Sequence, residues 1–157
     1  MKITITSAVG TGPTELGAFD AALRNAGIEN YNLIALSSVI PPGSALEIGR
    51  FRTEPAEYGQ RLYVVIARHE TSRVGEEAWA GLGWTQERDT GRGLFVELHG
   101  TDRRGVERDI DSTLDAMKAA RPYEYAKNER ELAGIRCESQ PVCALVVATY
   151  LSEPWTR

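Results

Sequence analysis

The chain has 157 residues, of which 42% are hydrophobic and 25% charged, and its formal net charge at pH 7 is −4. This composition is typical of a globular domain that can bury a core without disulfides or metal ions. The slightly acidic balance gives no basic field to attract nucleic acid or an anionic membrane surface. No apolar run reaches the length of a membrane span, because the longest, residues 142–151, is interrupted by Thr149.

The cysteines and the start of the chain bear on the cellular compartment. Cys137 and Cys143 are the only cysteines and lack Cys-x-x-Cys spacing, so we interpret them as buried or half-buried structural thiols. Lys2 is followed directly by alternating residues, and we expect no secretory signal there. The sequence predicts a reduced, cytoplasmic protein.

The first part of the chain predicts two strands with a helix between them. Residues 2–8 alternate between apolar and polar side chains, which predicts a strand with one buried face. Thr14 can cap a helix that continues to Ala26, and Gly27 suits the end of that helix. Residues 31–38 contain the apolar run Leu-Ile-Ala-Leu and predict the second strand.

The rest of the chain predicts further strands and a second helix. Residues 41–60 are rich in proline and glycine, and we expect irregular structure there. An amphipathic helix is expected from Val106 to Met117, ending before Pro122. Strands are expected at residues 62–68, 77–84, 94–99, 132–138 and 142–150. Six or seven strands and two main helices predict a single α+β domain with helices layered on sheet.

Two features that resemble binding motifs carry little signal. The stretch GTGPTELG, residues 10–17, lacks the Gly-Lys-Ser/Thr ending of a phosphate-binding loop, so we interpret it as a capped helix start. His69 and His99 are the only histidines, and neither lies in a short, patterned cluster of ligands. We therefore expect no metal site and interpret both as satisfied or exposed strand residues.

Three polar residues in apolar surroundings have two interpretations each. Strand alternation places Phe95, Glu97 and His99 on one face. Glu97 is then either on a solvent-facing edge or in an apolar pocket, where a raised pKa would let it deliver a proton near neutral pH. Asp20 either borders the apolar stripe of its helix or faces a pocket that receives a cation. Asn32 lies in an apolar strand and needs hydrogen-bond partners if buried.

The stretch NYNLIALSSVIPPGS, residues 30–44, poses the main question. An apolar strand runs into the pair Ser37-Ser38, and a rigid Pro41-Pro42-Gly43 turn follows. A serine pair at a strand end is usually a turn. Alternatively, a serine hydroxyl can attack the preceding carbonyl where the backbone is held distorted. The resulting ester would split by β-elimination, and the dehydroalanine left behind would hydrolyse to a pyruvoyl group.

A resemblance to a known family favours the second interpretation. GAFDAALRNAGIENYNLIALSSVIPPG, residues 17–43, closely resembles the self-processing region of pyruvoyl-dependent arginine decarboxylases. GLFVELHG, residues 93–100, resembles the second signature of that family, in which Gly-Leu and two apolar residues precede a glutamate. The resemblance implies a layered αββα sandwich. It also implies trimers with active sites between subunits, so we expect a homotrimer or a dimer of trimers.

The resemblance further implies a zymogen that cleaves itself between Ser37 and Ser38. Residues 1–37 would form the β chain, and residues 38–157 the α chain, capped by a covalent pyruvoyl cofactor derived from Ser38. The enzyme would convert L-arginine to agmatine and CO2 through a Schiff base. Agmatine can feed polyamine biosynthesis, acid resistance or a specialised pathway.

The family's site residues map onto single positions of this sequence. By resemblance, Glu97 is the proton donor and Asp20 the carboxylate that binds the guanidinium of the substrate. Lining and processing positions correspond to Leu16, the Tyr31 backbone, Asn32 near the pyruvoyl group, and Ser37 as the new C-terminus beside the substrate.

Two alternatives remain open at this point. One is a pyruvoyl decarboxylase for another amino acid, of which histidine and lysine fit Asp20 best. The other is a paralogue that keeps Ser37 and Ser38, never cleaves, and serves as a binding or structural subunit. Denaturing mass spectrometry separates the two classes, because only the enzyme yields two fragments.

Overall fold

The computed structural model describes residues 1–156 as two β-sheets with a helix on the outer face of each. The elements in chain order are β1 (Lys2–Thr11), α1 (Glu15–Ala26), β2 (Asn32–Ala35), β3 (Val39–Ile40), β4 (Ala45–Ile48), the 3₁₀ turn η1 (Pro55–Glu57), β5 (Arg61–Thr71), β6 (Glu77–Gln86), β7 (Gly93–Gly100), α2 (Arg103–Ala119), β8 (Glu129–Arg136) and β9 (Val142–Glu153).

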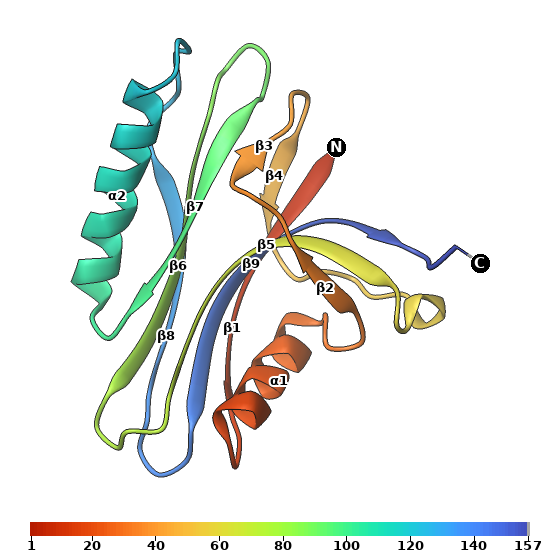
Figure 1. Cartoon of the computed structure of the whole chain (residues 1–157), viewed down its shortest axis with the longest axis vertical. Helices are drawn as coiled ribbons and strands as arrows, with labels where there is room; N and C mark the ends of the chain where they lie inside the picture. Colours follow the sequence, from red (N-terminus) through yellow and green to blue (C-terminus); the bar gives the residue numbers. More distant parts are fainter. Residues whose placement is uncertain (157) are drawn as a thin grey trace.

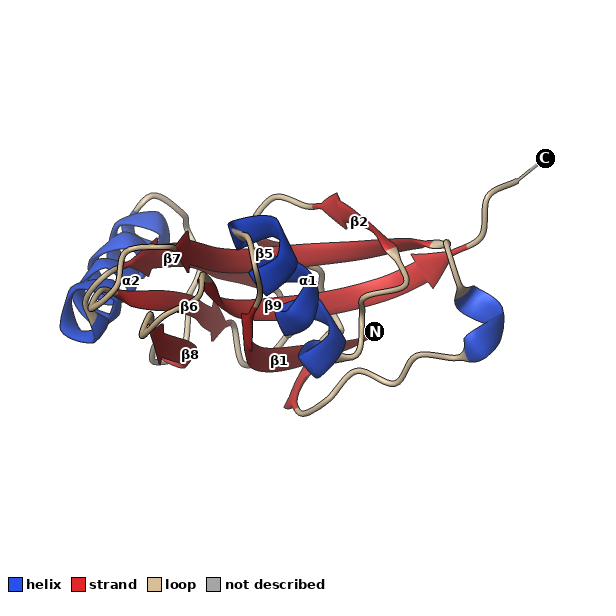
Figure 2. Cartoon of the chain, turned by 90° about the horizontal axis from the view of Figure 1, so that it is seen from below, coloured by secondary structure: helices blue, strands red, loops and turns tan. Residues whose placement is uncertain are grey.

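The strands form a sheet of five and a sheet of four. The first sheet has the order β2-β5-β9-β1-β4 and the second the order β3-β7-β6-β8. Figure 1 shows the layers in the succession α2, second sheet, first sheet, α1. The predicted α+β class and the layered αββα sandwich are thus confirmed. Figure 2 shows that η1 and the end of β9 lie at the end of the molecule opposite α2.

The main core fills the space between the two sheets. Its residues come from the inward-facing positions of both sheets, where alternate side chains are apolar. The largest of them include Ile3, Ile5, Leu82, Trp84 and Phe95. Cys137 belongs to this core and Cys143 to the one under α1, so both thiols are buried, as predicted.

Helix α1 begins and ends where its capping residues predict, and α2 extends a few residues beyond the predicted span of Val106 to Met117. The Thr14 hydroxyl accepts a hydrogen bond from the Gly17 backbone N–H at 3.0 Å, and Gly27 closes α1 with φ 81°. On the other side, α2 packs against β6 at two glycines. A Cβ on Gly83 would lie 2.3 Å from Cγ2 of Ile110, so this helix approaches the sheet as closely as it does only because Gly83 has no side chain.

The sequence interpretation is corrected in two places. Residues 31–38 are not one strand, because β2 ends at Ala35 and β3 begins at Val39 in the other sheet. Residues 41–60 are not wholly irregular, because they contain β4 and η1. The described residues therefore hold nine strands instead of six or seven. Strand β4 pairs only with β1, at the edge of its sheet, and its exposed residues carry no buried alternation for a sequence pattern to reveal.

A membrane-spanning helix is not found among residues 1–156, where neither helix is both long and apolar enough to cross a bilayer.

Candidate active site

Residues 36–38 carry the chain from one sheet to the other. The Leu36 backbone N–H donates to the Val64 carbonyl on β5 at 2.8 Å, which ties this end to the first sheet. The Phe95 N–H on β7 donates to the Ser38 carbonyl at 3.0 Å, which ties the other end to the second sheet. The Ser37–Ser38 peptide bond therefore bridges the open edge between β5 and β7. We call this edge the mouth of the sandwich.

The Ser38 hydroxyl meets the predicted carboxylate at the mouth. Ser38 Oγ donates a hydrogen bond to Oε2 of Glu97 at 2.9 Å. An ionised carboxylate in this position can accept the hydroxyl proton and so raise the nucleophilicity of the oxygen. The Val39 N–H donates to the Ser37 carbonyl at 2.9 Å, which polarises the carbonyl that Ser38 would attack.

The serine pair is anchored at both ends, and its backbone has neither a positive φ nor a cis peptide bond. Among residues 1–156 no residue other than glycine has a positive φ, and no peptide bond is cis. The distorted backbone expected from the sequence is therefore not present as a left-handed residue. What the structure offers is the fixed position of the Ser37 carbonyl between two sheets.

Glu97 faces the space between the sheets, as strand alternation predicts. It lies opposite Leu82 of β6, and His99 lies opposite Ala80; both partners belong to the inter-sheet core. Phe95 on the same face is fully buried, whereas Glu97 is exposed, because the core thins out toward the mouth. In a single chain the carboxylate is thus within reach of solvent.

Tyr150 is a member of the site that the sequence interpretation did not identify. Its hydroxyl donates to the Val39 carbonyl at 2.9 Å, and its ring meets Phe95 edge-on at 6.3 Å. Burial, and then the charge of Glu97, raise the pKa of Tyr150 to about 12, so the hydroxyl remains a donor at neutral pH. The only sequence signal was an aromatic residue at the end of the apolar run of β9.

The predicted substrate-binding residues of α1 lie on an exposed surface. Leu16 is 76% exposed. The Asp20 carboxylate forms an ion pair with Arg24, one turn further along the helix, at 3.3 Å. Next to it, Phe19 packs under the guanidinium of Arg68 from β5 at 4.0 Å, which fixes this helix face against the sheet.

The start of β2 is held by the loop that follows η1. The Asn32 side-chain amide donates to the Gly59 carbonyl at 2.7 Å. The Tyr31 hydroxyl donates to the carboxylate of Glu57, and burial followed by that carboxylate raises the pKa of Tyr31 to about 12. Asn32 is therefore engaged at the opposite end of β2 from the serine pair.

The predicted site residues thus fall into two groups within one chain. The mouth group consists of Ser37, Ser38 and Glu97, joined by the hydrogen bonds given above. The outer group lies on α1 and at the start of β2 and consists of Leu16, Asp20, Tyr31 and Asn32. In the described part of the chain, no hydrogen bond or ion pair links the outer group to Ser38 or Glu97.

Comparisons with known proteins point to one family. The profile of the family described as "Pyruvoyl-dependent arginine decarboxylase (PvlArgDC)" matches residues 2–154. An Archaeoglobus fulgidus protein named pyruvoyl-dependent arginine decarboxylase 2 is 34% identical over 121 residues, which cover 74% of each chain. A Halobacterium salinarum protein named pyruvoyl-dependent arginine decarboxylase is 43% identical over 96 residues, 61% of this chain. A Thermoplasma volcanium protein of the same name is 33% identical over 98 residues, 62% of this chain.

The chain spans part of the length of these relatives. The matched residues cover 59% of the Halobacterium protein and 54% of the Thermoplasma protein. The match to the family profile, by contrast, includes both sheets, both helices and all residues of the two groups.

Proposed function

Because the chain belongs to the family of pyruvoyl-dependent arginine decarboxylases, we propose that it cleaves itself and then converts L-arginine to agmatine and CO2. One observation carries this proposal. The Ser38 hydroxyl lies 2.9 Å from a carboxylate oxygen of Glu97, beside a peptide bond fixed between two sheets. A serine pair that formed only a turn would not require a carboxylate at that hydroxyl.

Self-cleavage uses groups already in contact. Glu97 takes the proton of the Ser38 hydroxyl as Oγ bonds to the carbonyl carbon of Ser37, and the C–N bond breaks as the Ser38 nitrogen gains a proton. β-Elimination then removes the Cα proton of residue 38 and breaks its Cβ–O bond, which releases the Ser37 carboxylate. The remaining dehydroalanine takes up one water and loses ammonia, which leaves the pyruvoyl group. The products are a β chain of residues 1–37 and an α chain that begins with the pyruvoyl group.

The surroundings of Ser38 fit a pyruvoyl group. The Ser38 carbonyl accepts from the Phe95 N–H, and the Leu36 N–H donates to the Val64 carbonyl. Cleavage between Ser37 and Ser38 breaks neither of these hydrogen bonds to the sheets. The group would therefore remain beside Glu97, and the new Ser37 carboxylate would remain at the mouth. Held there, the group would supply a carbonyl for the α-amine of the substrate and an electron sink for the loss of CO2.

The chain's own residues supply the rest of the reaction. Glu97 delivers a proton to Cα of the substrate after CO2 has left. Asp20 binds the guanidinium through a charge-assisted, potentially bidentate pair. Leu16, the Tyr31 backbone and the Asn32 side chain line the pocket between these two ends.

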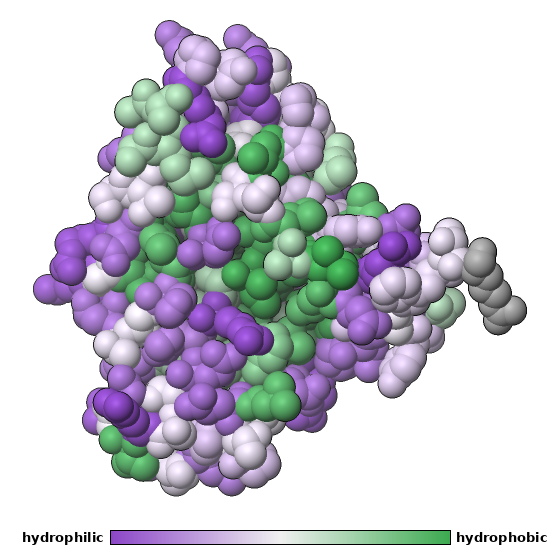
Figure 3. Space-filling model, in the orientation of Figure 1, coloured by the Kyte–Doolittle hydropathy of each residue, from purple (hydrophilic) through white to green (hydrophobic). Residues whose placement is uncertain are grey.

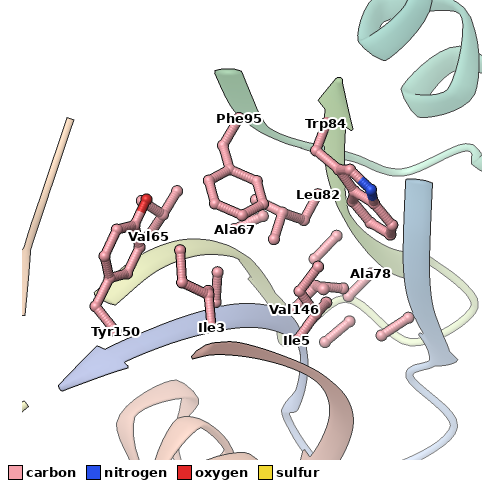
Figure 4. Close-up of a cluster of buried hydrophobic side chains, with 14 of the residues drawn as sticks. Ile3, Ile5, Val65, Ala67, Ala78, Leu82, Trp84, Phe95, Val146 and Tyr150 are labelled. Atoms are coloured by element: carbon pink, nitrogen blue, oxygen red, sulfur yellow. The ribbon is translucent and has the colours of Figure 1, made fainter. Parts of the chain in front are cut away.

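The separation of the two groups supports a site shared between subunits. Asp20 forms an ion pair with Arg24, and Asn32 a hydrogen bond to Gly59, so neither contacts the mouth group of its own chain. We infer that a complete site takes the outer group from a neighbouring copy. Figure 3 shows hydrophobic surface gathered over the region of β2 and β5, and Ile34 and Val39 are 37% and 56% exposed. We infer that a second copy covers this surface, in a homotrimer or a dimer of trimers.

We propose a cytoplasmic location, which the state of the two thiols supports. Cys137 and Cys143 are both free and buried, in separate cores, which suits a reducing cytoplasm.

The decisive experiment is denaturing mass spectrometry followed by product analysis. We expect fragments of residues 1–37 and 38–157, the second with a blocked N-terminus, and agmatine as the product from arginine. A single intact chain would overturn self-cleavage and support a non-catalytic paralogue. Complete cleavage with turnover of histidine or lysine, and none of arginine, would overturn only the substrate.

A further inference from the structure

The two histidines of the chain meet at the mouth of the sandwich. Nδ1 of His69 on β5 lies 3.1 Å from Nδ1 of His99 on β7. The ring centroids are 5.1 Å apart and the ring planes differ by 18°. The distance between the ring centroids is close to the nitrogen–nitrogen distance plus the radii of the two rings, as expected for rings that lie side by side in nearly one plane. The rings therefore meet edge to edge in an N–H···N hydrogen bond and do not stack face to face.

Such a pair accepts one proton readily and a second with difficulty. In the neutral pair one Nδ1 carries the hydrogen and the other offers its lone pair. A first proton enters at the outer nitrogen of the donor ring and leaves a stronger, charge-assisted hydrogen bond. A second would have to displace the shared hydrogen bond and place two cations side by side. The two rings therefore act as one hydrogen-bonded unit when they take up or release a proton.

The pair shares its face with Glu97. His69 lies opposite Ala144 of β9 and His99 opposite Ala80 of β6, and both alanines are buried in the inter-sheet core. On the same face of β7, Glu97 precedes His99 by two residues, about 6.6 Å along the strand. That distance allows one bridging water.

The other charged groups near the pair point elsewhere or are already engaged. On β5, Arg68 and Glu70 flank His69 and project to the opposite face, where they form an ion pair at 3.3 Å. On β9, Tyr150 shares the inner face, but its hydroxyl donates to the Val39 carbonyl. On β8, Glu131 also faces the inter-sheet space, but it lies beyond β6 and accepts a hydrogen bond from the Ser7 hydroxyl. Glu97, on the same strand as His99, is therefore the inner-face carboxylate next to the pair.

Decarboxylation of an amino acid consumes a proton at every turnover. The substrate loses its carboxylate as CO2, and Cα takes a proton in its place. If Glu97 is the donor, it is left ionised after each cycle and must be protonated again before the next. Glu97 is exposed in the single chain, so a route for protons is needed once a second copy covers the mouth, as proposed above.

We propose that the His69–His99 pair returns a proton to Glu97 after each turnover, through a water between His99 and Glu97. This role rests on the proposed function. The protonated pair gives up one proton to the Glu97 carboxylate, and the exposed His99 recovers one from solvent or buffer. Both histidines act through Glu97 and have no contact with the substrate.

The kinetic test uses cleaved His99→Asn protein, which keeps a polar side chain but has no titratable ring. We expect a first turnover at the wild-type rate, then a steady state slowed by roughly tenfold or more in dilute buffer, because reprotonation becomes limiting. Added imidazole should restore the steady state. Asp109→Asn on the exposed face of α2 is the matched surface control and should show neither effect. An unchanged steady state, or one that imidazole does not restore, would overturn the role.

A second measurement needs no activity. The chain has only two histidines, so single variants assign their NMR signals. In uncleaved Ser38→Ala protein we expect the Nδ1 signals of the two rings to show one shared N–H···N hydrogen, and His99 to lose this signature when His69→Asn is added. Two independent rings in the parent protein would overturn the proton-sharing pair. If no arginine is turned over, the proposed function and the reprotonation of Glu97 by the pair both fail, while this NMR measurement still tests the hydrogen-bonded pair.

Discussion

The mouth group and the outer group differ in how complete they are within one chain. At the mouth, Ser38 and Glu97 are in hydrogen-bond contact, and the backbone around them is anchored to both sheets. In the outer group, Asp20 and Asn32 are exposed and bonded to residues of their own surroundings. On our proposal, the difference means that the groups for cleavage lie within one chain, whereas binding of the substrate needs two.

The largest effect on this comparison is expected from Ser38→Ala. Without the hydroxyl there is no nucleophile and no source of the pyruvoyl group, so cleavage and decarboxylation should both be abolished. Denaturing mass spectrometry should find one intact chain, and product analysis no agmatine. Release of agmatine by this variant would end the proposal.

Glu97→Gln separates the two roles of the carboxylate. The amide oxygen can still accept a hydrogen bond from the Ser38 hydroxyl but cannot take its proton, so we expect slower cleavage that still reaches completion. Glutamine cannot donate a proton to Cα, so turnover should fall by about 10²–10⁴. The measurement is arginine turnover by cleaved protein whose pyruvoyl content has been determined. Wild-type turnover with full pyruvoyl content would show that another group is the donor.

Asp20→Asn addresses the outer group alone. It removes the charge opposite the guanidinium, and the loss of one partner of a desolvated pair costs about 2–5 kcal/mol. We expect KM for arginine to rise, with cleavage unaffected because Asp20 has no contact with the serine pair. The control is Asp109→Asn, which changes the same charge on the other helix. An unchanged KM would leave Asp20 as a solvated residue of α1.

Mixing chains tests whether the two groups come from different copies. If each site takes Asp20 from one chain and Glu97 from another, random assembly of Asp20→Asn with Glu97→Gln chains restores about a quarter of the sites. The assay is agmatine formation after co-expression, compared with each variant alone. Failure of the mixture to exceed the variants would indicate that each chain uses its own two groups.

The smallest effect is expected from Tyr150→Phe. The ring remains against Phe95, but the Val39 carbonyl loses its donor, at a cost of about 1 kcal/mol. We expect a slightly lower melting temperature and slower cleavage, because the segment after the serine pair is held less firmly. A time course of cleavage measures the effect. Identical time courses and melting temperatures would show that the hydrogen bond has no role in positioning.

Much of the fold follows from local signals in the sequence. Thr14 and Gly27 delimit α1 because a capping hydroxyl and a left-handed glycine act on neighbouring residues. Alternation along residues 94–99 correctly assigned Phe95, Glu97 and His99 to one face. Strand β4 was missed because it is short and exposed and depends on β1 for its hydrogen bonds.

The sequence by itself determined both helices, most of the longer strands, their faces and the family, since each depends on residue type and spacing along the chain. Only the tertiary structure decided that Ser37 and Ser38 cross between the sheets, because that requires β2 and β3 to pair with different partners. It also brought Ser38 to Glu97, 59 positions apart, and His69 to His99, 30 apart. Contacts between distant residues depend on how the sheets pack, and no local pattern along the chain encodes that packing.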